Sequence, residues 1–199
     1  FKACGIRTAA LLREPPPADY LGINFSPLSK RRIAPDLLDA AGLPARAVAV
    51  FFKNSETEIR ELLARYPFEA AQVYAGDVSP EFVRSLKQKV MLACQVRTPA
   101  DLEQLNHYAL DVDAFILDGA APGSGQVMET AIPADFPYPF LLAGGLHASK
   151  LELALRHPNC VGVDIASGIE TAGEVDVRKI VETRRRLDLL SAPSVPAAR

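Results

Sequence analysis

The sequence predicts an α/β fold consisting of a single (β/α)8 barrel (TIM barrel) of near-minimal size. Short apolar runs rich in Val, Ile and Phe recur along the chain, and most are near-continuous, as in strands buried on both faces. Segments with helix start signals lie between several of them. Repeated strand–helix units indicate parallel strands joined by right-handed crossovers. Eight candidate strands in 199 residues leave about 25 residues per unit, which suits a small barrel. Periodicity alone leaves a doubly wound open sheet as the competing fold.

Eight apolar runs are the predicted strands. In chain order they are Lys2–Cys4, Tyr20–Phe25, Ala47–Phe52, Ala70–Tyr74, Val90–Val96, Ala114–Leu117, Phe140–Leu142 and Val161–Val163.

Helix start signals stand after several of these strands. Ser55-Glu56-Thr57-Glu58 has the residues of a capping box, and the apolar residues that follow recur at helical spacing. Ser79 and Thr98 each precede a proline that can occupy the first helical position. A last amphipathic helix is expected from about Asp176.

Two helical connections, the first and the sixth, are predicted to be shortened. The prolines of Arg13–Pro17 limit the first helix to a turn or two, because proline cannot continue a helix. Met128–Pro139 contains three prolines and has little helical character. No linker divides the chain, so we expect residues 1–190 to form one catalytic barrel. We expect residues 191–199, which are small, polar and proline-containing, to be a disordered tail.

Composition excludes several classes of partner. The chain is 49% hydrophobic and 23% charged, with a formal net charge of −2 and a pI near 6.0. Because it lacks a broad basic field, we expect no nucleic-acid partner. No apolar run approaches the roughly 20 residues that cross a bilayer, and no secretory signal is recognisable. We therefore expect a soluble protein with no membrane partner.

The cysteines and histidines indicate neither a disulfide scaffold nor a metal site. Cys4, Cys94 and Cys160 are odd in number and form no CxxC pair, which favours a reducing compartment and hence a cytoplasmic location. The three histidines are scattered, and no zinc-type ligand spacing occurs. We expect no bound metal.

In a barrel of this kind the working residues lie at the C-terminal ends of the strands. Lys2 and Cys4 alternate to the same side of the first strand, and a cation beside a thiol favours the thiolate. Cys4 could then act as a base or nucleophile, although most free cysteines are simply small buried residues. Asp118 closes the sixth strand, either as a helix cap or as a working carboxylate. Facing each other across the barrel mouth, Cys4 and Asp118 would supply one acid and one base.

Loops after three other strands add candidate anion-binding groups. Gly144-Gly145 and Ser167-Gly168 follow the seventh and eighth strands, where barrels commonly bind phosphate, although glycines also form ordinary turns. Arg31, in the basic segment Ser26–Ile33, could hold a carboxylate through two parallel hydrogen bonds, or could lie on a solvated face. Gly123-Ser124-Gly125 could be a flexible cover or only a turn.

Four segments, taken in order and spacing, carry a resemblance to a known family. They are Lys2-Ala3-Cys4-Gly5-Ile6, Tyr20–Phe25 with Ser29-Lys30-Arg31, Leu142-Ala143-Gly144-Gly145-Leu146 and Val163–Glu170. Together they resemble phosphoribosylanthranilate isomerase, a (β/α)8 enzyme of tryptophan biosynthesis, from Lys2 to about Leu190.

The resemblance implies an intramolecular oxidoreductase that converts N-(5-phosphoribosyl)anthranilate into 1-(2-carboxyphenylamino)-1-deoxyribulose 5-phosphate. This is an Amadori rearrangement that needs no cofactor. Asp118 would be the general acid and Cys4 the general base, and Arg31 would hold the anthranilate carboxylate.

The resemblance also implies the remaining contacts with a small phosphorylated substrate. Lys2, Gln72 and Asp164 would lie at the substrate. Backbone amides around Gly144, Gly145, Ser167 and Gly168 would bind its phosphate. A monomer or a homodimer is expected.

The chain departs from the family pattern at several places. Gln72-Val73-Tyr74-Ala75 stands where the family typically has Gln-Leu-His-Gly, and the loop after the sixth strand is altered. Two other functions therefore remain open. One is a related sugar-phosphate isomerase or epimerase with a different aglycone, and the other is a non-catalytic barrel that binds a phosphorylated ligand.

Overall fold

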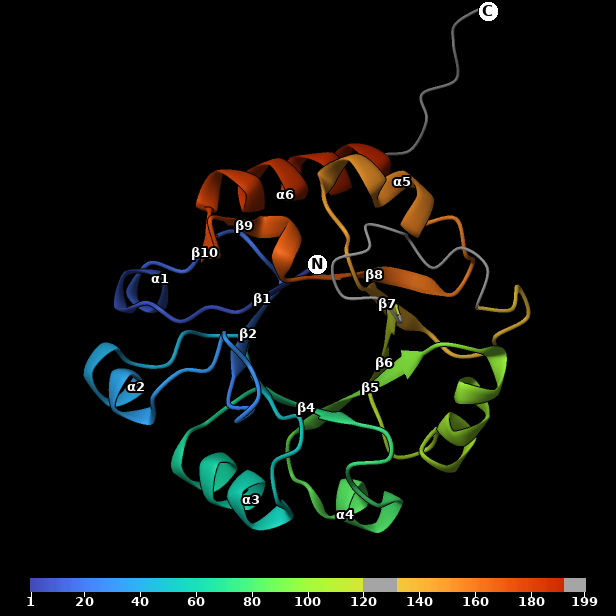
Figure 1. Cartoon of the computed structure of the whole chain (residues 1–199), viewed down its shortest axis with the longest axis horizontal. Coiled ribbons are helices and arrows are strands. Elements are labelled where there is room, and N and C mark those ends of the chain that lie inside the picture. Colours follow the sequence, from blue (N-terminus) through green and yellow to red (C-terminus); the bar gives the residue numbers. More distant parts are fainter. Residues whose placement is uncertain (120–131, 192–199) are drawn as a thin grey trace, which may run out of the picture.

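The computed structural model describes residues 1–119 and 132–191, and within them eight parallel strands close into a barrel (Figure 1). Each strand pairs with the next along the chain, and β1 pairs with β8 to complete the ring. The strands are β1 Lys2–Cys4, β2 Tyr20–Asn24, β3 Ala47–Val50, β4 Ala70–Tyr74, β5 Lys89–Val96, β6 Ala114–Gly119, β7 Phe140–Ala143 and β8 Cys160–Ile165. The closed ring confirms the predicted fold class and excludes the open sheet.

Helices cover the outside of the barrel (Figure 1). The α-helices are α1 Ala9–Arg13, α2 Pro35–Ala41, α3 Glu56–Arg65, α4 Pro80–Ser85, α5 Leu151–Ala154 and α6 Val177–Ser191. The described residues also form the 3-10 helices η1 Pro99–His107, η2 Ala148–Lys150 and η3 Ser167–Ile169.

The predicted start signals act as helix caps. The Ser55 side chain accepts a hydrogen bond from the Glu58 backbone N–H, and the Glu58 carboxylate accepts one from the Ser55 backbone N–H. Ser79 caps α4 in the same way through the Phe82 backbone. The segment after Thr98 does form a helix, but of the tighter 3-10 type.

Both connections predicted to be short lack a full helix where the structure describes them. Helix α1 has five residues and ends before the three prolines. Of the sixth connection, the described residues 132–139 contain no helix, and the rest of it, with Gly123-Ser124-Gly125, lies outside the described residues. Ser191 belongs to α6 rather than to the predicted tail, and residues 192–199 also lie outside the described residues.

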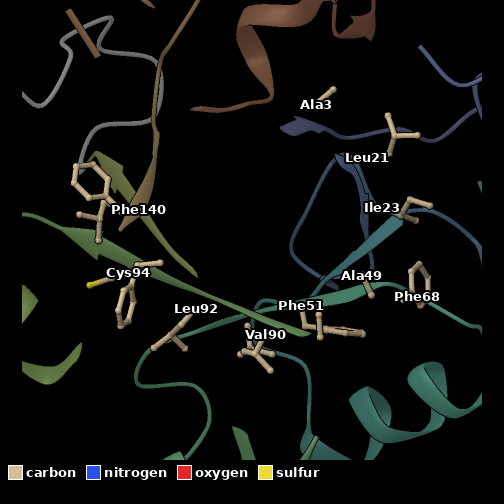
Figure 2. Close-up of a cluster of buried hydrophobic side chains, with 14 of the residues drawn as sticks. Ala3, Leu21, Ile23, Ala49, Phe51, Phe68, Val90, Leu92, Cys94 and Phe140 are labelled. Atoms are coloured by element: carbon tan, nitrogen blue, oxygen red, sulfur yellow. The ribbon is translucent and has the colours of Figure 1, made fainter. Parts of the chain in front are cut away.

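Side-chain alternation along the strands builds two apolar layers. Outward-facing residues such as Leu21, Leu92 and Phe140 pack with the helices in the larger cluster, part of which Figure 2 shows. Inward-facing residues such as Val48 and Ile116 form a smaller cluster inside the barrel. Because alternate residues share a face, the inward positions nearer the C-terminal ends of the strands are free to carry polar groups.

A two-stranded hairpin follows β8. Strands β9 Glu170–Thr171 and β10 Glu174–Val175 are antiparallel and are joined by Ala172 and Gly173, which both have positive φ. Such a two-residue turn matches the twist of a hairpin. The hairpin places Glu170 close to the barrel mouth.

Among residues 1–119 and 132–191, no helix has both the length and the apolar character needed to span a membrane.

Candidate active site

A cavity of about 340 Å³ opens at the C-terminal ends of the strands. Every strand except β5 contributes a residue at its end or in the loop that follows it. Eight of the ten residues predicted for the site line this cavity, and they are Cys4, Arg31, Gln72, Asp118, Gly144, Gly145, Asp164 and Ser167. The remaining two, Lys2 and Gly168, do not line it but contact residues that do.

Lys2 lies beneath the cavity and is fully buried. Its ammonium donates hydrogen bonds to both carboxylate oxygens of Asp164, at 2.9 and 3.0 Å. The parallel register of β1 and β8, which pairs Lys2 with Asp164, brings the two side chains together. Burial alone would lower the pKa of Lys2, but the Asp164 carboxylate and Cys4 outweigh it and raise that pKa, so the amine stays charged.

Cys4 lies on the same inward face of β1 as Lys2, as the alternation predicts. Burial raises the pKa of the thiol, and the Asp164 carboxylate raises it further. Lys2 and Arg31 lower it by less, so the net shift is upward. Lys2 lowers the pKa of the thiol, as the sequence predicts, but burial outweighs Lys2 and favours the protonated thiol. Burial disfavours the thiolate most strongly, and the negative charge of Asp164 disfavours it further.

Asp118 closes β6 and faces the cavity. Burial raises its pKa to about 6, with a further contribution from the Asp164 carboxylate that Lys2 only partly offsets. The carboxyl group can therefore keep its proton well above the usual range for aspartate. A glycine makes room for it, because a Cβ at Gly144 would lie 2.7 Å from Asp118 Oδ1.

Gln72 and Tyr74 extend from β4 into the cavity. Gln72 is 2% exposed, and its Oε1 has no hydrogen-bond partner among the described residues. Burial and the charges of Asp118, Cys4 and Asp164 raise the pKa of Tyr74, so its phenol stays neutral. Its ring packs edge-on against Phe52, with ring centroids 4.8 Å apart. This part of the cavity wall therefore has the aromatic ring of Tyr74, whose neutral hydroxyl can donate a hydrogen bond, and the unpaired acceptor Oε1 of Gln72.

Arg31 reaches the cavity from the loop after β2. Its Nε and Nη2 donate to the two carboxylate oxygens of Glu170, at 2.6 and 2.7 Å. These hydrogen bonds, more than any other influence, raise the pKa of the guanidinium. Arg31, which the sequence predicts to bind a carboxylate, thus lies at the site. The edge of its guanidinium formed by Nε and Nη2 already binds the Glu170 carboxylate.

The two glycine-containing loops lie against each other. Gly144 and Gly145 have φ of 92° and 62°, a conformation that favours glycine, so backbone rather than side chain lines the cavity there. Gly168 is needed for close packing, because a Cβ there would lie 1.8 Å from the carbonyl oxygen of Leu146. Because Gly168 has no side chain, the loop that carries Ser167 can pack closely against the loop that carries Gly145.

Across residues 1–119 and 132–191, no group of three His, Cys, Asp or Glu side chains is arranged to hold a metal ion. The site itself has several groups that can take part in chemistry. It offers a carboxylic acid, a thiol, a buried ion pair, a guanidinium and backbone amides.

Sequence reasoning did not assign a role to Glu170, although it lies at the end of the Val163–Glu170 segment. Its side chain is 10% exposed and pairs with Arg31 across 139 residues of sequence. The available signal was an acidic residue immediately after the loop of the last strand. An acidic residue at this position indicates a contact with Arg31 only when the hairpin formed by β9 and β10 is known.

Comparisons with known proteins agree on one family. The family model for N-(5′-phosphoribosyl)anthranilate (PRA) isomerase matches residues 1–184. The N-(5′-phosphoribosyl)anthranilate isomerase of Brucella canis is 33% identical over 202 residues, which cover 90% of each chain.

Solved structures give the same result. Phosphoribosyl anthranilate isomerase from Thermus thermophilus is 31% identical, with a TM-score of 0.76 over 95% of this chain and 98% of its own. Another isomerase of that name is 25% identical, with a TM-score of 0.76 over 94% and 97% of the two chains. It was solved in complex with reduced 1-(o-carboxyphenylamino)-1-deoxyribulose 5-phosphate.

Proposed function

The chain belongs to the N-(5′-phosphoribosyl)anthranilate isomerase family, and we propose that it carries out the Amadori rearrangement of N-(5′-phosphoribosyl)anthranilate with Asp118 as acid and Cys4 as base. The observation that carries this assignment is that a carboxyl group with a pKa of about 6 and a thiol line one small cavity together with Arg31.

Asp118 opens the sugar ring in this proposal. Its carboxylic acid gives a proton to the ring oxygen, and the bond between that oxygen and C1 breaks. The nitrogen lone pair forms a C1=N double bond, which gives a Schiff base. Burial helps this step, because it keeps part of the Asp118 population protonated near neutral pH.

Cys4 then acts on C2. The thiolate removes the C2 proton, the freed electron pair forms a C1=C2 bond, and the C1=N pair returns to nitrogen. The enaminol becomes a ketone when its C2 hydroxyl returns a proton to Asp118 and the Cys4 thiol protonates C1. Both side chains end in their starting states, so the reaction needs no cofactor.

The productive form combines a protonated Asp118 with a thiolate at Cys4. Because the Cys4 pKa is raised and that of Asp118 is about 6, this combination is a minor form of the singly protonated pair. Lys2 makes the form attainable, since its buried ammonium favours the thiolate.

Other parts of the cavity would bind the ends of the substrate. Arg31 would hold the anthranilate carboxylate, and Tyr74, whose ring packs against Phe52, lines the same cavity. The backbone of Gly144-Gly145 and Ser167 would bind the sugar phosphate. Lys2 would act through Asp164 and Cys4 rather than by touching substrate, because it lies beneath the cavity.

The test is turnover, followed as the loss of anthranilate fluorescence from the substrate. We expect Cys4→Ala and Asp118→Ala each to lower kcat by roughly 100-fold or more, as removal of a general base or acid does. Cys160→Ala is the matched thiol control, because Cys160 is only partly buried and lies at the opposite end of β8 from the cavity.

Two outcomes would contradict the proposal. One is a wild-type protein that binds phosphorylated analogues without turnover, which would indicate a binding barrel. The other is full activity in both variants. Turnover of phosphorylated aminosugars that lack the anthranilate carboxylate would indicate a different aglycone.

We further propose that the enzyme acts in the cytoplasm, as a monomer or a homodimer, on a small phosphorylated substrate. Its three cysteines are free, which suits a reducing compartment.

A further inference from the structure

The contact between Arg31 and Glu170 uses one particular edge of the guanidinium. Nε and Nη2 each donate to a different oxygen of the Glu170 carboxylate. A guanidinium has five N–H donors, arranged so that two edges can each bind a carboxylate with two parallel hydrogen bonds. Glu170 occupies the side edge, and the Nη1–Nη2 end edge has no acceptor in residues 1–119 and 132–191.

Only one of the two partners lines the catalytic cavity. Arg31 lines the catalytic cavity, whereas Glu170 does not. Both line a second hollow, which also includes Arg7 and Gly173 and shares Arg31 with the catalytic cavity. Glu170 therefore binds Arg31 without itself lining the catalytic cavity, and the Nη1–Nη2 edge is the one that a ligand in that cavity could bind.

Glu170 is itself held in place. Its backbone carbonyl accepts a hydrogen bond from Lys179 of α6. Arg7 donates to the carbonyl of Gly173 on the hairpin and to the carbonyl of Lys30 on the Arg31 loop, both at 2.7 Å. The two loops that carry the pair are thus connected by a third residue.

Gly5 leaves room for the Arg31 side chain in this position. A Cβ at Gly5 would lie 2.8 Å from Arg31 Cδ, so a larger residue would displace the side chain. The guanidinium is also close enough to Cys4 to influence the pKa of its thiol. A carboxylate bound by Arg31 would therefore lie near the proposed base.

We infer that Glu170 is a positioning residue that holds the Arg31 guanidinium by one edge, so that its other edge selects a substrate carrying a carboxylate on its aromatic ring. This inference rests on the proposed isomerase function and adds a specificity determinant to it. Displacement of Glu170 by the substrate is disfavoured, because it would leave a carboxylate that is 10% exposed without its partner.

The experiment measures binding rather than turnover. The probes are reduced 1-(o-carboxyphenylamino)-1-deoxyribulose 5-phosphate and the same compound without the ring carboxyl group, titrated calorimetrically into wild type and Glu170→Gln. We expect the wild type to prefer the carboxylated probe. In Glu170→Gln that preference should fall about 10-fold or more, because a misplaced guanidinium loses its paired hydrogen bonds. Affinity for the probe without a carboxyl group should stay within about twofold.

Glu174→Gln is the control for loss of an acidic side chain from the same hairpin, because Glu174 pairs with Arg7 rather than Arg31 and Arg7 keeps its two hydrogen bonds to backbone carbonyls. Kinetics give a second readout, in which KM should rise in Glu170→Gln with much less change in kcat.

The outcomes separate this inference from the proposed function. If Glu170→Gln retains the wild-type preference, or loses affinity for both probes equally, the positioning role is wrong while the isomerase function stands. If wild type shows no preference for the carboxylated probe, Arg31 does not bind that carboxylate and the inference about Glu170 fails with it, while turnover still decides the isomerase function.

Discussion

The pKa of the Cys4 thiol depends on Lys2, two residues away in the chain, and on Asp164, which is far away in the chain. Only the influence of Lys2 could be predicted from the sequence. Alternation along a strand shows that Lys2 and Cys4 share a face, and it predicts that the cation lowers the thiol pKa. Asp164 is 160 positions from Cys4 in the chain and arrives only when β8 closes the ring. Burial within the closed barrel is the largest influence on the thiol pKa, and together with the charge of Asp164 it makes the net shift upward. Residue types at a site could thus be predicted here, whereas their protonation states depended on contacts distant in sequence.

The raised pKa of Asp118 predicts a pH dependence of stability. The folded protein holds this proton up to about pH 6, whereas an ordinary aspartate loses it near 3.8. The contribution of Asp118 to stability is therefore fully present below the lower value and is lost as the pH rises through the higher one. At 1.36 kcal/mol for each pKa unit, the total is about 3 kcal/mol.

Urea unfolding of wild type and Asp118→Asn checks this prediction. Asparagine does not titrate, so the stability of wild type relative to the variant should decrease between pH 5 and pH 7. A difference that stays constant over this range would show that the pKa of Asp118 is not raised.

Among the elements, those with strong local signals were predictable. Strand β4 occupies the expected residues Ala70–Tyr74, and the Ser55 capping box opens α3 as expected. The hairpin that carries Glu170 was not predicted, because strands of two residues show no periodicity. The glycine loops were recognised as candidate anion sites, but their close contacts with Asp118 and Leu146 depend on how β6, β7 and β8 are arranged.

A glycine at the end of β7 controls the position of the acid, and Gly144→Ala tests this. The new Cβ would lie 2.6 Å from the Gly119 nitrogen and 2.7 Å from Asp118 Oδ1, so the Asp118 carboxyl group must move. We expect kcat to fall by roughly 10-fold or more, because small misplacements of catalytic groups are costly.

Gly42→Ala is the control for backbone strain. Gly42 has a φ of 85°, similar to that of Gly144, but a Cβ there meets nothing within 4 Å. Both variants should lose about 1 kcal/mol or more of stability from the left-handed conformation. Only Gly144→Ala should lose activity, and equal losses in both would contradict the assignment.

At the scale of the whole molecule, the Lys2–Asp164 pair joins the first strand of the barrel to the last. Asp164→Asn would leave a buried ammonium without its carboxylate, which typically costs about 3 to 5 kcal/mol. The double variant Lys2→Met/Asp164→Asn should lose less unfolding free energy than the sum of the losses in the two single variants, because no uncompensated charge remains. Chemical denaturation of the single and double variants measures this coupling.

The exposed pair Arg65–Asp39 is the comparison for that cycle. Both side chains are about half exposed, so we expect the coupling energy between them to be small. Strict additivity for Lys2 and Asp164 would show that the pair does not stabilise the closed barrel.

Pairing of β1 with β8 closes the barrel around Cys4, so the reactivity of the Cys4 thiol should depend on whether the barrel has closed. In a chain whose last strand has not yet docked, the thiol is uncovered and Lys2 has no carboxylate beside it, so both influences that suppress the thiolate are absent. Alkylation of Cys4 should then be fastest while the barrel is open. The same closure that completes the fold would shield the nucleophile from reagents other than a ligand that fits the cavity.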